Sequence, residues 1–235
     1  MMASKEDDRF TRTRFLFGDA FEHFSNIKVA IFGVGGVGGF ALDSLYRVGI
    51  GHQSNGDSKS VGITIVDKDI FDITNQNRQI GSEAVGEIKV EVLAKIYPGI
   101  LPIQAKVNQD FINQFDFDSY DYVIDAIDDI DAKVMLAKAC ENKPYGRYIC
   151  STGSAKKLNP LEIRVDSIWR SYGDRFGKKL REALKKDNFK GDFKVIFSPE
   201  TPKCKVLGSF SAVTASFGLQ IGSEVVRDIL NQNKG

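Results

Sequence analysis

Three glycines in the first part of the chain have the spacing of a phosphate-binding turn. Gly33, Gly35 and Gly38 form the pattern GxGxxG directly after a short apolar run. The first glycine permits a tight turn, the second lets the backbone approach a phosphate, and the third lets a helix pack on a strand. Asp67 ends the next apolar run, where a carboxylate can accept hydrogen bonds from a ribose. Up to this point NAD and ATP fit equally well.

Three charged residues further along distinguish the two nucleotides. They are Arg78, Lys89 and Asp128. A hydride-transfer site needs an acid or base near the nicotinamide ring and has little use for cations near the phosphates. Attack on the α-phosphate of ATP instead requires cations and a metal-binding carboxylate, which stabilise the phosphoryl group and the departing pyrophosphate. Each residue alone is typical of a solvated surface, but together they favour ATP.

Strands and helices that alternate along the chain would position these residues. Short apolar runs predict strands at 27–33, 63–67, 101–107, 121–129 and 147–151, and helical patterns begin at residue 37 and occupy 83–97, 108–115 and 131–143. This alternation predicts an α/β fold with a doubly wound, mostly parallel, Rossmann-like sheet whose ligands bind where the strands end. The polar segment 52–62 predicts a surface loop inserted before the second strand.

The regular alternation of predicted strands and helices changes after Thr152. Strands are predicted at 161–168 and 193–198, a basic amphipathic helix at 173–187 and a final helix at 212–230. We therefore divide the chain into an ATP-binding region at 1–151 and a basic, substrate-binding extension of the same domain at 152–235. The extension completes the sheet.

Charge is distributed unevenly along the chain. The whole chain has a net charge of +1, but residues 156–205 hold 14 Lys and Arg against seven Asp and Glu, a local charge of +7. Such an asymmetry is typical of a protein with a polyanionic partner, and equally of a solvated lysine-rich surface. Both interpretations remain open on charge alone.

Cysteine spacing and the two ends of the chain exclude several classes of protein. Cys140, Cys150 and Cys204 form no CxxC pair, so we expect neither zinc nor a disulfide framework. The N-terminus has no apolar signal segment, so we expect a cytoplasmic protein. The apolar stretch near the C-terminus contains Glu224 and predicts a buried helix, without stable membrane insertion.

Five short motifs together resemble the HesA/MoeB/ThiF superfamily, the fold of ubiquitin-activating-type adenylating enzymes. The motifs, found between about Arg9 and Ser151, are GVGGVGG, the DxD at Asp67 and Asp69, TNQNRQ, VGxxK ending at Lys89, and DAID ending at Asp128. The resemblance implies that ATP and Mg²⁺ bind here. The implied nucleotide-binding residues are Gly33, Gly35, Gly36 and Gly38 on the phosphates, Asp67 on the ribose beside Asp69, Asn75 in the same pocket, Arg78 and Lys89 on the phosphates, and Asp128 on Mg²⁺.

The superfamily also presents an N-terminal arginine to the nucleotide of a partner subunit. Arg12 is the nearest match, with Arg14 as the alternative, and this implies a homodimer. The segment from Ser151 to Lys186 resembles the tRNA threonylcarbamoyladenosine dehydratase branch. That branch implies an ATP-dependent cyclisation, in which the carboxylate of a modified adenosine next to the tRNA anticodon is adenylated and then closes on its own ureido group. Sulfur-transfer proteins are implied as further partners.

A tRNA substrate would use the basic segment. The side chains expected to contact its phosphates are Lys156, Lys157, Arg164, Arg170, Arg175, Lys178, Lys179, Arg181, Lys185 and Lys186. Tyr172 is a candidate for stacking on a base, whereas core packing is favoured for Trp169. The alternative functions are an adenylyltransferase for a ubiquitin-like sulfur carrier, an NAD-dependent oxidoreductase and a non-enzymatic binding protein.

Overall fold

A single seven-stranded sheet forms the centre of the molecule. The computed structural model of the chain describes residues 7–52 and 62–232, so nearly all of the predicted 52–62 loop lies outside the described residues. The strands are β1 (Val29–Phe32), β2 (Ile63–Asp67), β3 (Leu101–Gln104), β4 (Tyr122–Asp125), β5 (Tyr148–Ser151), β6 (Arg164–Ser167) and β7 (Lys194–Phe197). Their order in the sheet is β3-β2-β1-β4-β5-β7-β6, and all neighbours are parallel except β6 with β7. The predicted mostly parallel sheet is therefore confirmed.

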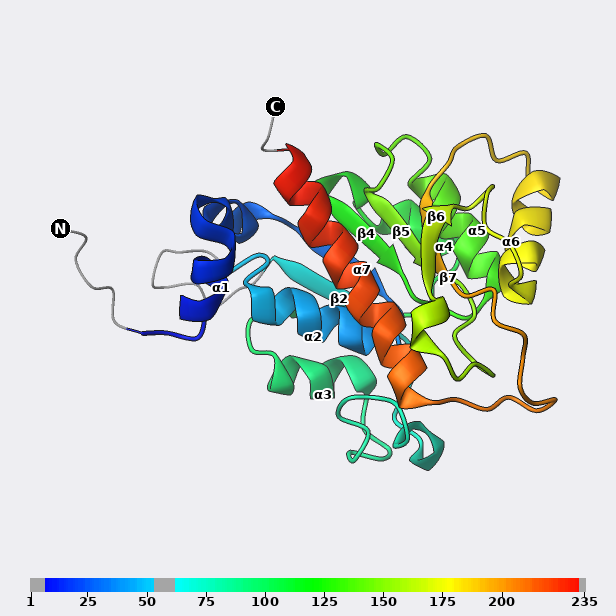
Figure 1. Ribbon diagram of the computed structural model, residues 1–235, viewed down its shortest axis with the longest axis horizontal. Coiled ribbons are helices and arrows are strands. Elements are labelled where there is room, and N and C mark those ends of the chain that lie inside the picture. The colour runs from blue at the N-terminus through cyan, green and yellow to red at the C-terminus, as the bar shows by residue number, and fades with distance from the viewer. Residues whose placement is uncertain (1–6, 53–61, 233–235) are drawn as a thin grey trace.

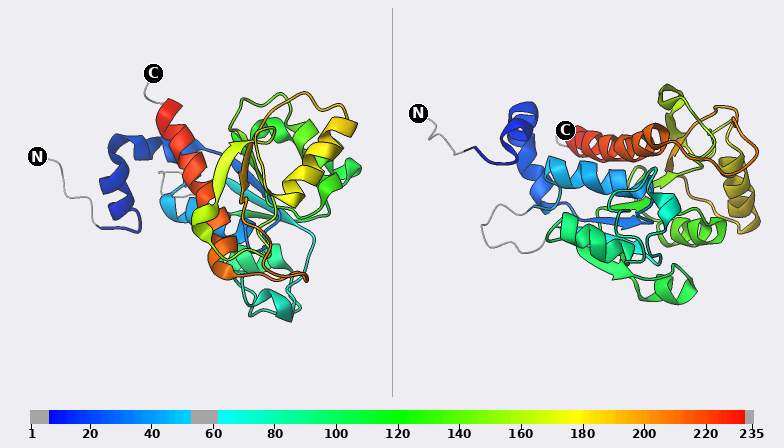
Figure 2. Two further views of the ribbon diagram at one scale, coloured as in Figure 1. Left: turned by 45° about the vertical axis from the view of Figure 1, so that its right-hand side comes forward. Right: turned by 90° about the horizontal axis from the view of Figure 1, so that it is seen from below.

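Helices cover both faces of the sheet (Figures 1 and 2). One face packs against α2 (Gly38–Val48), α3 (Lys89–Ile96) and α7 (Ser211–Gln232), and the other against α4 (Gln109–Gln114), α5 (Ile130–Ala139) and α6 (Arg175–Lys186). Strand β1 shows how the sequence produces this arrangement. Val29 and Ile31 belong to one apolar core and Ala30 and Phe32 to the other, because successive side chains of a strand point to opposite faces. A strand buried on both faces is apolar throughout.

The final helix, α7, packs directly on α2. A Cβ atom on Gly218 would lie 2.3 Å from the carbonyl oxygen of Val37, and one on Gly222 would lie 2.4 Å from Ser44 Oγ. The small residues in this apolar stretch therefore permit close helix packing. Glu224 forms an ion pair with Lys194 on β7 at 2.9 Å, which places this helix on the sheet as a buried element. None of the described helices combines the length and the apolar character that crossing a membrane requires.

Two predicted elements begin later than the sequence pattern suggests. The helix predicted from residue 83 begins only at Lys89, because residues 83–88 form a turn in which Gly86 has a φ of +88°. In that turn the N–H of Gly86 donates to the carbonyl of Phe71, and the N–H of Phe71 donates to the carbonyl of Glu87. Backbone groups of Gly86 and Glu87 are therefore paired with Phe71 and not with a helical turn. The strand predicted from residue 161 begins at Arg164, after the 3₁₀ turn η4 (Pro160–Glu162).

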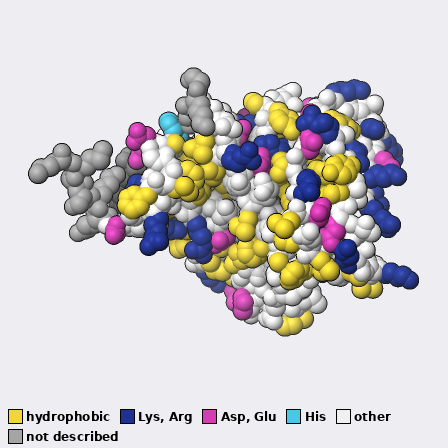
Figure 3. Space-filling model, viewed as in Figure 1, with side chains coloured by type: hydrophobic (Ala, Val, Ile, Leu, Met, Phe, Trp, Pro, Cys, Tyr) yellow, Lys and Arg dark blue, Asp and Glu magenta, His cyan; other side chains and the backbone are white. Residues whose placement is uncertain are grey.

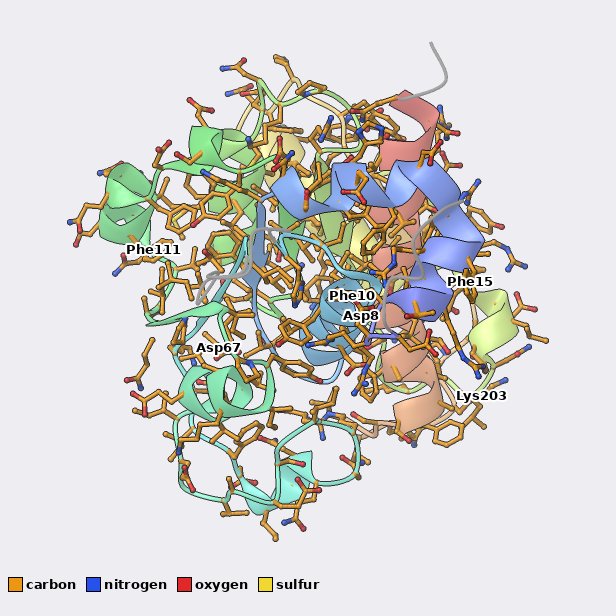
Figure 4. All side chains as sticks on the ribbon, turned by 90° about the vertical axis from the view of Figure 1, so that its left-hand side faces the viewer. Asp8, Phe10, Phe15, Asp67, Phe111 and Lys203 are labelled. Carbon is orange, nitrogen blue, oxygen red and sulfur yellow. The ribbon has the colours of Figure 1, made fainter. Side chains whose placement is uncertain are left out.

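The sequence pattern did not reveal the N-terminal helices. Helix α1 (Thr11–Phe17) is followed by the 3₁₀ segment η1 (Gly18–Asn26), and both lie at the end of the molecule opposite α6 (Figure 1). Helix α1 contains no buried residue. Its Phe15 and Leu16 are 81% and 76% exposed, and Phe15 projects from the helix surface (Figure 4).

Candidate functional site

A cavity of about 570 Å³ lies at the edge of the sheet where the parallel strands end. Its walls come from the loops that follow β1, β2, β3, β4 and β5, from the start of α6, and from residues 207–214. Open parallel sheets bind their ligands at this edge, and the volume falls within the range of roughly 300–1,000 Å³ that ligand pockets occupy. The sequence-predicted residues Gly33, Gly35, Gly36, Asp67 and Asp69 all line it.

The glycine turn has the geometry that its spacing predicts. Gly33 has a φ of +81°, a left-handed conformation that favours glycine. A Cβ atom on Gly38 would lie 1.8 Å from the carbonyl oxygen of Gly33, so only glycine permits this contact between helix and strand. Gly38 therefore packs against the backbone of the turn and does not line the cavity.

Asp67 connects the glycine turn to the end of β2 (Figure 4). Its Oδ2 accepts a hydrogen bond from the N–H of Val34 at 2.8 Å, and its Oδ1 accepts one from the N–H of Asp69 at 2.9 Å. Each carboxylate oxygen keeps a second lone pair. The side chain is thus fixed at the cavity wall and can still accept hydrogen bonds from a ribose.

Two residues of the TNQNRQ motif have different places: Arg78 lines the cavity, whereas Asn75 stabilises the turn before it. Asn75 is buried and does not line the cavity. Its side chain accepts the N–H of Asp72 at 3.1 Å and closes the capping box of η2 (Ile73–Asn75). Arg78 lines the cavity, and its aliphatic carbons would lie 3.2 Å from a Cβ atom on Gly36, so this glycine leaves room for the arginine. The guanidinium donates to the carbonyl of Thr74 at 2.8 Å.

The ammonium of Lys89 lies at the cavity wall because α3 begins at this residue. The side chain is 8% exposed, its Nζ lies 3.8 Å from Asp69 Oδ2, and the Phe71 ring lies beneath it at 5.9 Å. Asp69 is also 2.6 Å from Lys68 Nζ, which raises the pKa of Lys68. The cavity therefore presents fixed cations close to the carboxylates of the DxD motif.

Asp128 follows β4 and is exposed at the cavity wall. Among the residues that the structure describes, its carboxylate has no hydrogen-bond or ion-pair partner, and no three metal-binding side chains cluster in the described ranges. One free carboxylate suits Mg²⁺, which proteins commonly hold through one or two carboxylates together with phosphate oxygens and water.

A buried ion pair beneath this loop was not predicted from the sequence. Lys133 on α5 is 1% exposed, and its Nζ lies 2.8 Å from Asp125 Oδ1, whose carboxylate is fully buried. Tyr148 Oη donates to Asp125 Oδ2 at 2.7 Å, and the N–H of Ile127 donates to Asp125 Oδ1 at 3.1 Å. Burial by itself lowers the pKa of Lys133, but the nearby Asp125 carboxylate outweighs it and the pKa lies above its ordinary value. The pair fixes the backbone that leads to Asp128. A lysine at an apolar position of a predicted helix was the available signal.

Cys140 and Cys150 are placed as small buried side chains rather than as nucleophiles. Burial raises the pKa of the Cys140 thiol to about 12 and holds that of Cys150 well above its ordinary range. Cys204 is exposed but does not line the cavity. A thiol with a raised pKa has little thiolate at neutral pH and reacts slowly.

The basic segment is only partly available to a partner. Lys157 is buried and donates to the carbonyls of Ser198 and Glu200, so its predicted role on the surface is wrong. Trp169 packs beside Phe189 and donates to a backbone carbonyl, as favoured. Lys and Arg gather over α6 (Figure 3). Within the described part of the chain, the exposed cations of this helix without an ion-pair partner are Arg175, Lys179, Lys185 and Lys186.

Arg12 and Arg14 lie on α1 and do not line the cavity. Arg14 is held by Asp8 at 2.6 Å and lies over the Phe21 ring, whereas Arg12 is exposed. Neither arginine contacts the cavity of its own subunit among the described residues, so the role of Arg12 at the nucleotide of a partner subunit stays a prediction.

Comparison with known proteins agrees with this architecture. A family model described as the ThiF family matches residues 9–235. The tRNA threonylcarbamoyladenosine dehydratase of Bacillus subtilis is 34% identical over an alignment that covers 94% of each protein. The Escherichia coli enzyme of the same name is 33% identical over 82% of this chain and 74% of its own length. The crystal structure of the E. coli dehydratase in complex with ATP superposes with a TM-score of 0.85 at 29% identity, covering 96% of this chain and 95% of that one.

Proposed function

The chain belongs to the ThiF family, and we infer that it is an ATP-dependent tRNA threonylcarbamoyladenosine dehydratase. Two observations together carry the inference. A relative with this activity in its name matches the chain almost end to end, and the cavity holds the glycine turn, Asp67, Arg78, Lys89 and Asp128 together. An adenylyltransferase for a ubiquitin-like sulfur carrier is less well supported, because the chain has no paired cysteines.

The residues of the cavity suggest how ATP, the second substrate, is held. We propose that the N–H groups of the glycine turn and the cations of Arg78 and Lys89 bind the phosphates, while Asp67 accepts hydrogen bonds from the ribose. Asn75 would act indirectly, by fixing the turn that presents Arg78. Asp128 would hold Mg²⁺, which would supply positive charge at the phosphates.

The proposed reaction needs no nucleophile from the protein. The carboxylate of the modified adenosine attacks the α-phosphate of ATP, which gives an acyl-adenylate and pyrophosphate. The ureido group of the same nucleoside then displaces AMP and closes the ring, so the nucleoside loses one water overall. Both reacting groups belong to one molecule, which favours ring closure over external attack. The raised pKa values of the Cys140 and Cys150 thiols are consistent with a route that avoids a thioester.

The exposed residues of α1 support a homodimer. We propose that Arg12 reaches the ATP of the partner subunit and that Phe15 and Leu16 help to bury the contact, since large exposed apolar side chains often mark interfaces. Mixing inactive Arg12→Ala and Lys89→Ala subunits tests this. In a mixed dimer one site has both residues intact, so partial recovery of turnover is expected. If no mixture recovers activity, Arg12 does not act across an interface.

One assay tests the proposed function directly. The protein is incubated with ATP, Mg²⁺ and tRNA that contains threonylcarbamoyladenosine, and we expect AMP release together with a mass loss of one water in the nucleoside. Arg78→Ala, Lys89→Ala and Asp128→Ala are each expected to abolish turnover while thermal unfolding stays cooperative. If pyrophosphate exchange required a small protein ending in Gly-Gly, the sulfur-carrier alternative would replace this function.

Two further parts of the proposal concern the surroundings of the enzyme. A tRNA substrate would place the protein in the cytoplasm, and sulfur-transfer proteins remain proposed partners that affinity capture can test. The exposed cations of α6 would contact tRNA phosphates, a contribution that weakens as salt rises.

A further inference from the structure

Charge is distributed unequally between the two halves of the cavity. Of the described residues that line it, every charged side chain lies between residues 67 and 129, in the loops after β2, β3 and β4 and on the segments they lead into. The residues that line it from 151 onward are all uncharged. We call these the neutral half, which consists of residues 151–155, Phe176, Leu207, Ser209 and Thr214. A triphosphate needs the charged half, so the neutral half suits a different group.

The two halves meet between adjacent strands. Asp128 follows β4 and the loop 151–155 follows β5, and these strands are hydrogen-bonded neighbours in the sheet. A ligand in the neutral half would therefore lie beside the phosphates of an ATP bound in the charged half. The proposed reaction requires this proximity, because the carboxylate of the modified nucleoside must reach the α-phosphate of ATP. The following proposal thus rests on the proposed function.

Phe176 is the aromatic side chain of the neutral half, and its position is fixed by its surroundings. Its N–H donates to Asp174 at the start of α6, at 3.2 Å. Its Cβ would lie 3.1 Å from a Cβ atom on Gly153, so the loop packs closely against it. The buried ammonium of Lys133 lies 5.9 Å from the ring centroid, within reach of a cation–π attraction. A fixed aromatic ring in the neutral half of the cavity is suited to stacking on a planar base.

Two hydroxyl groups in the neutral half are free to contact a ligand. Among the described residues, neither Ser154 Oγ nor Ser209 Oγ has a hydrogen-bond partner, whereas Thr152 and Thr214 donate to backbone carbonyls. The carbonyl of Ser209 accepts the side-chain amide of Asn77 at 3.3 Å, which ties this wall to the segment that carries Arg78. The neutral half thus offers an aromatic ring and neutral hydrogen-bonding groups.

We propose that the neutral half is the subsite for the nucleoside that is cyclised, with Phe176 stacked on its purine base. Ser154 and Ser209 contact the neutral hydroxyl and ureido groups of the base modification. Its carboxylate points across the boundary to the charged half, where Arg78 and the α-phosphate lie. Phe176 therefore determines affinity for the modified nucleoside and leaves affinity for ATP unchanged.

The test compares three variants in steady-state turnover of the modified tRNA and in equilibrium binding of ATP. Phe176→Leu keeps an apolar side chain against Gly153 but removes the ring, and we expect the KM for modified tRNA to rise roughly 5-fold or more, as loss of a base–aromatic stack does. Phe176→Tyr keeps the ring and is expected to retain the wild-type KM. Tyr145→Leu is the matched control and should leave this KM unchanged, because Tyr145 is an exposed aromatic that lies outside the cavity.

The outcomes separate this inference from the function on which it rests. If the wild type converts modified tRNA and Phe176→Leu leaves its KM unchanged, the stacking role is refuted. If Phe176→Leu weakens ATP binding by the same factor, the ring belongs to the ATP subsite and the proposal is overturned. An equal rise in KM in Phe176→Tyr would reduce the residue to a packing role. A wild-type protein without activity on modified tRNA would instead refute the proposed function itself.

Discussion

Replacing Lys133 with methionine should lower the free energy of unfolding by about 3 kcal/mol, because it leaves a buried carboxylate without its cation. The two side chains are 1% and 0% exposed and their charged atoms are 2.8 Å apart. Breaking such a pair costs about 3–5 kcal/mol. Asp125 would keep its hydrogen bonds from Tyr148 and from the N–H of Ile127, which places the expected cost at the lower end.

Thermal and urea unfolding measure this cost. At about 2–4 °C per kcal/mol for a domain of this size, Tm should fall by roughly 6–12 °C. Asp125→Asn should also destabilise, and the double variant should cost clearly less than the two single changes added together. Lys138→Met, on the same helix, removes a half-exposed lysine paired with Asp187 at 2.7 Å and should cost less than about 1 kcal/mol. If Lys133→Met cost no more than Lys138→Met, or the two single costs were additive, the ion pair would not stabilise the fold in this way.

Gly38→Ala should cost about 3 kcal/mol or more in thermal unfolding, because its Cβ would lie 1.8 Å from a carbonyl oxygen. Gly39→Ala is the control, since its Cβ would meet nothing closer than 3.5 Å, and equal costs would contradict the steric argument. Burial lowers the pKa of His52 from 6.5, so the unfolded chain takes up this proton first and stability is lost as pH falls below 6.5. His52→Gln should flatten the dependence of Tm on pH there, and an unchanged slope would exclude His52 as its source. Replacing Lys179 and Lys185 with glutamine should weaken tRNA binding and reduce its salt dependence by roughly one unit of slope for each phosphate that is no longer neutralised. An unchanged slope would assign these lysines to solubility.

The charged half of the cavity and its glycine turn could be predicted from the sequence, because their residues follow one another along the chain. A glycine turn after an apolar run and Asp67 after the next run depend on local backbone rules, and the structure has both in the expected geometry. Asn75 shows the limit of this reasoning. Its place in a motif suggested the cavity, but its side chain closes a turn three residues long.

The buried pair and the neutral half could not be predicted in the same way. Lys133 shares the apolar face of α5 with Leu136 and Ala137, but the carboxylate that it meets there depends on how α5 packs on the sheet. Lys157 resembles part of a basic surface, but backbone carbonyls of a distant segment surround its ammonium. The electrostatics of these lysines are decided by contacts between residues far apart in the chain.

The sequence by itself determined the parallel sheet, the glycine turn and the charges that favour ATP, because strand periodicity, backbone sterics and residue charge are local properties. Only the tertiary structure decided which wall of the cavity carries these charges and which wall is uncharged. The sheet order places β5 beside β4, and α6 begins next to the loop after β5, so an uncharged wall with Phe176 lines the same cavity as the charged loops. That wall comes from segments dozens of residues apart, and only chain folding brings them into one cavity.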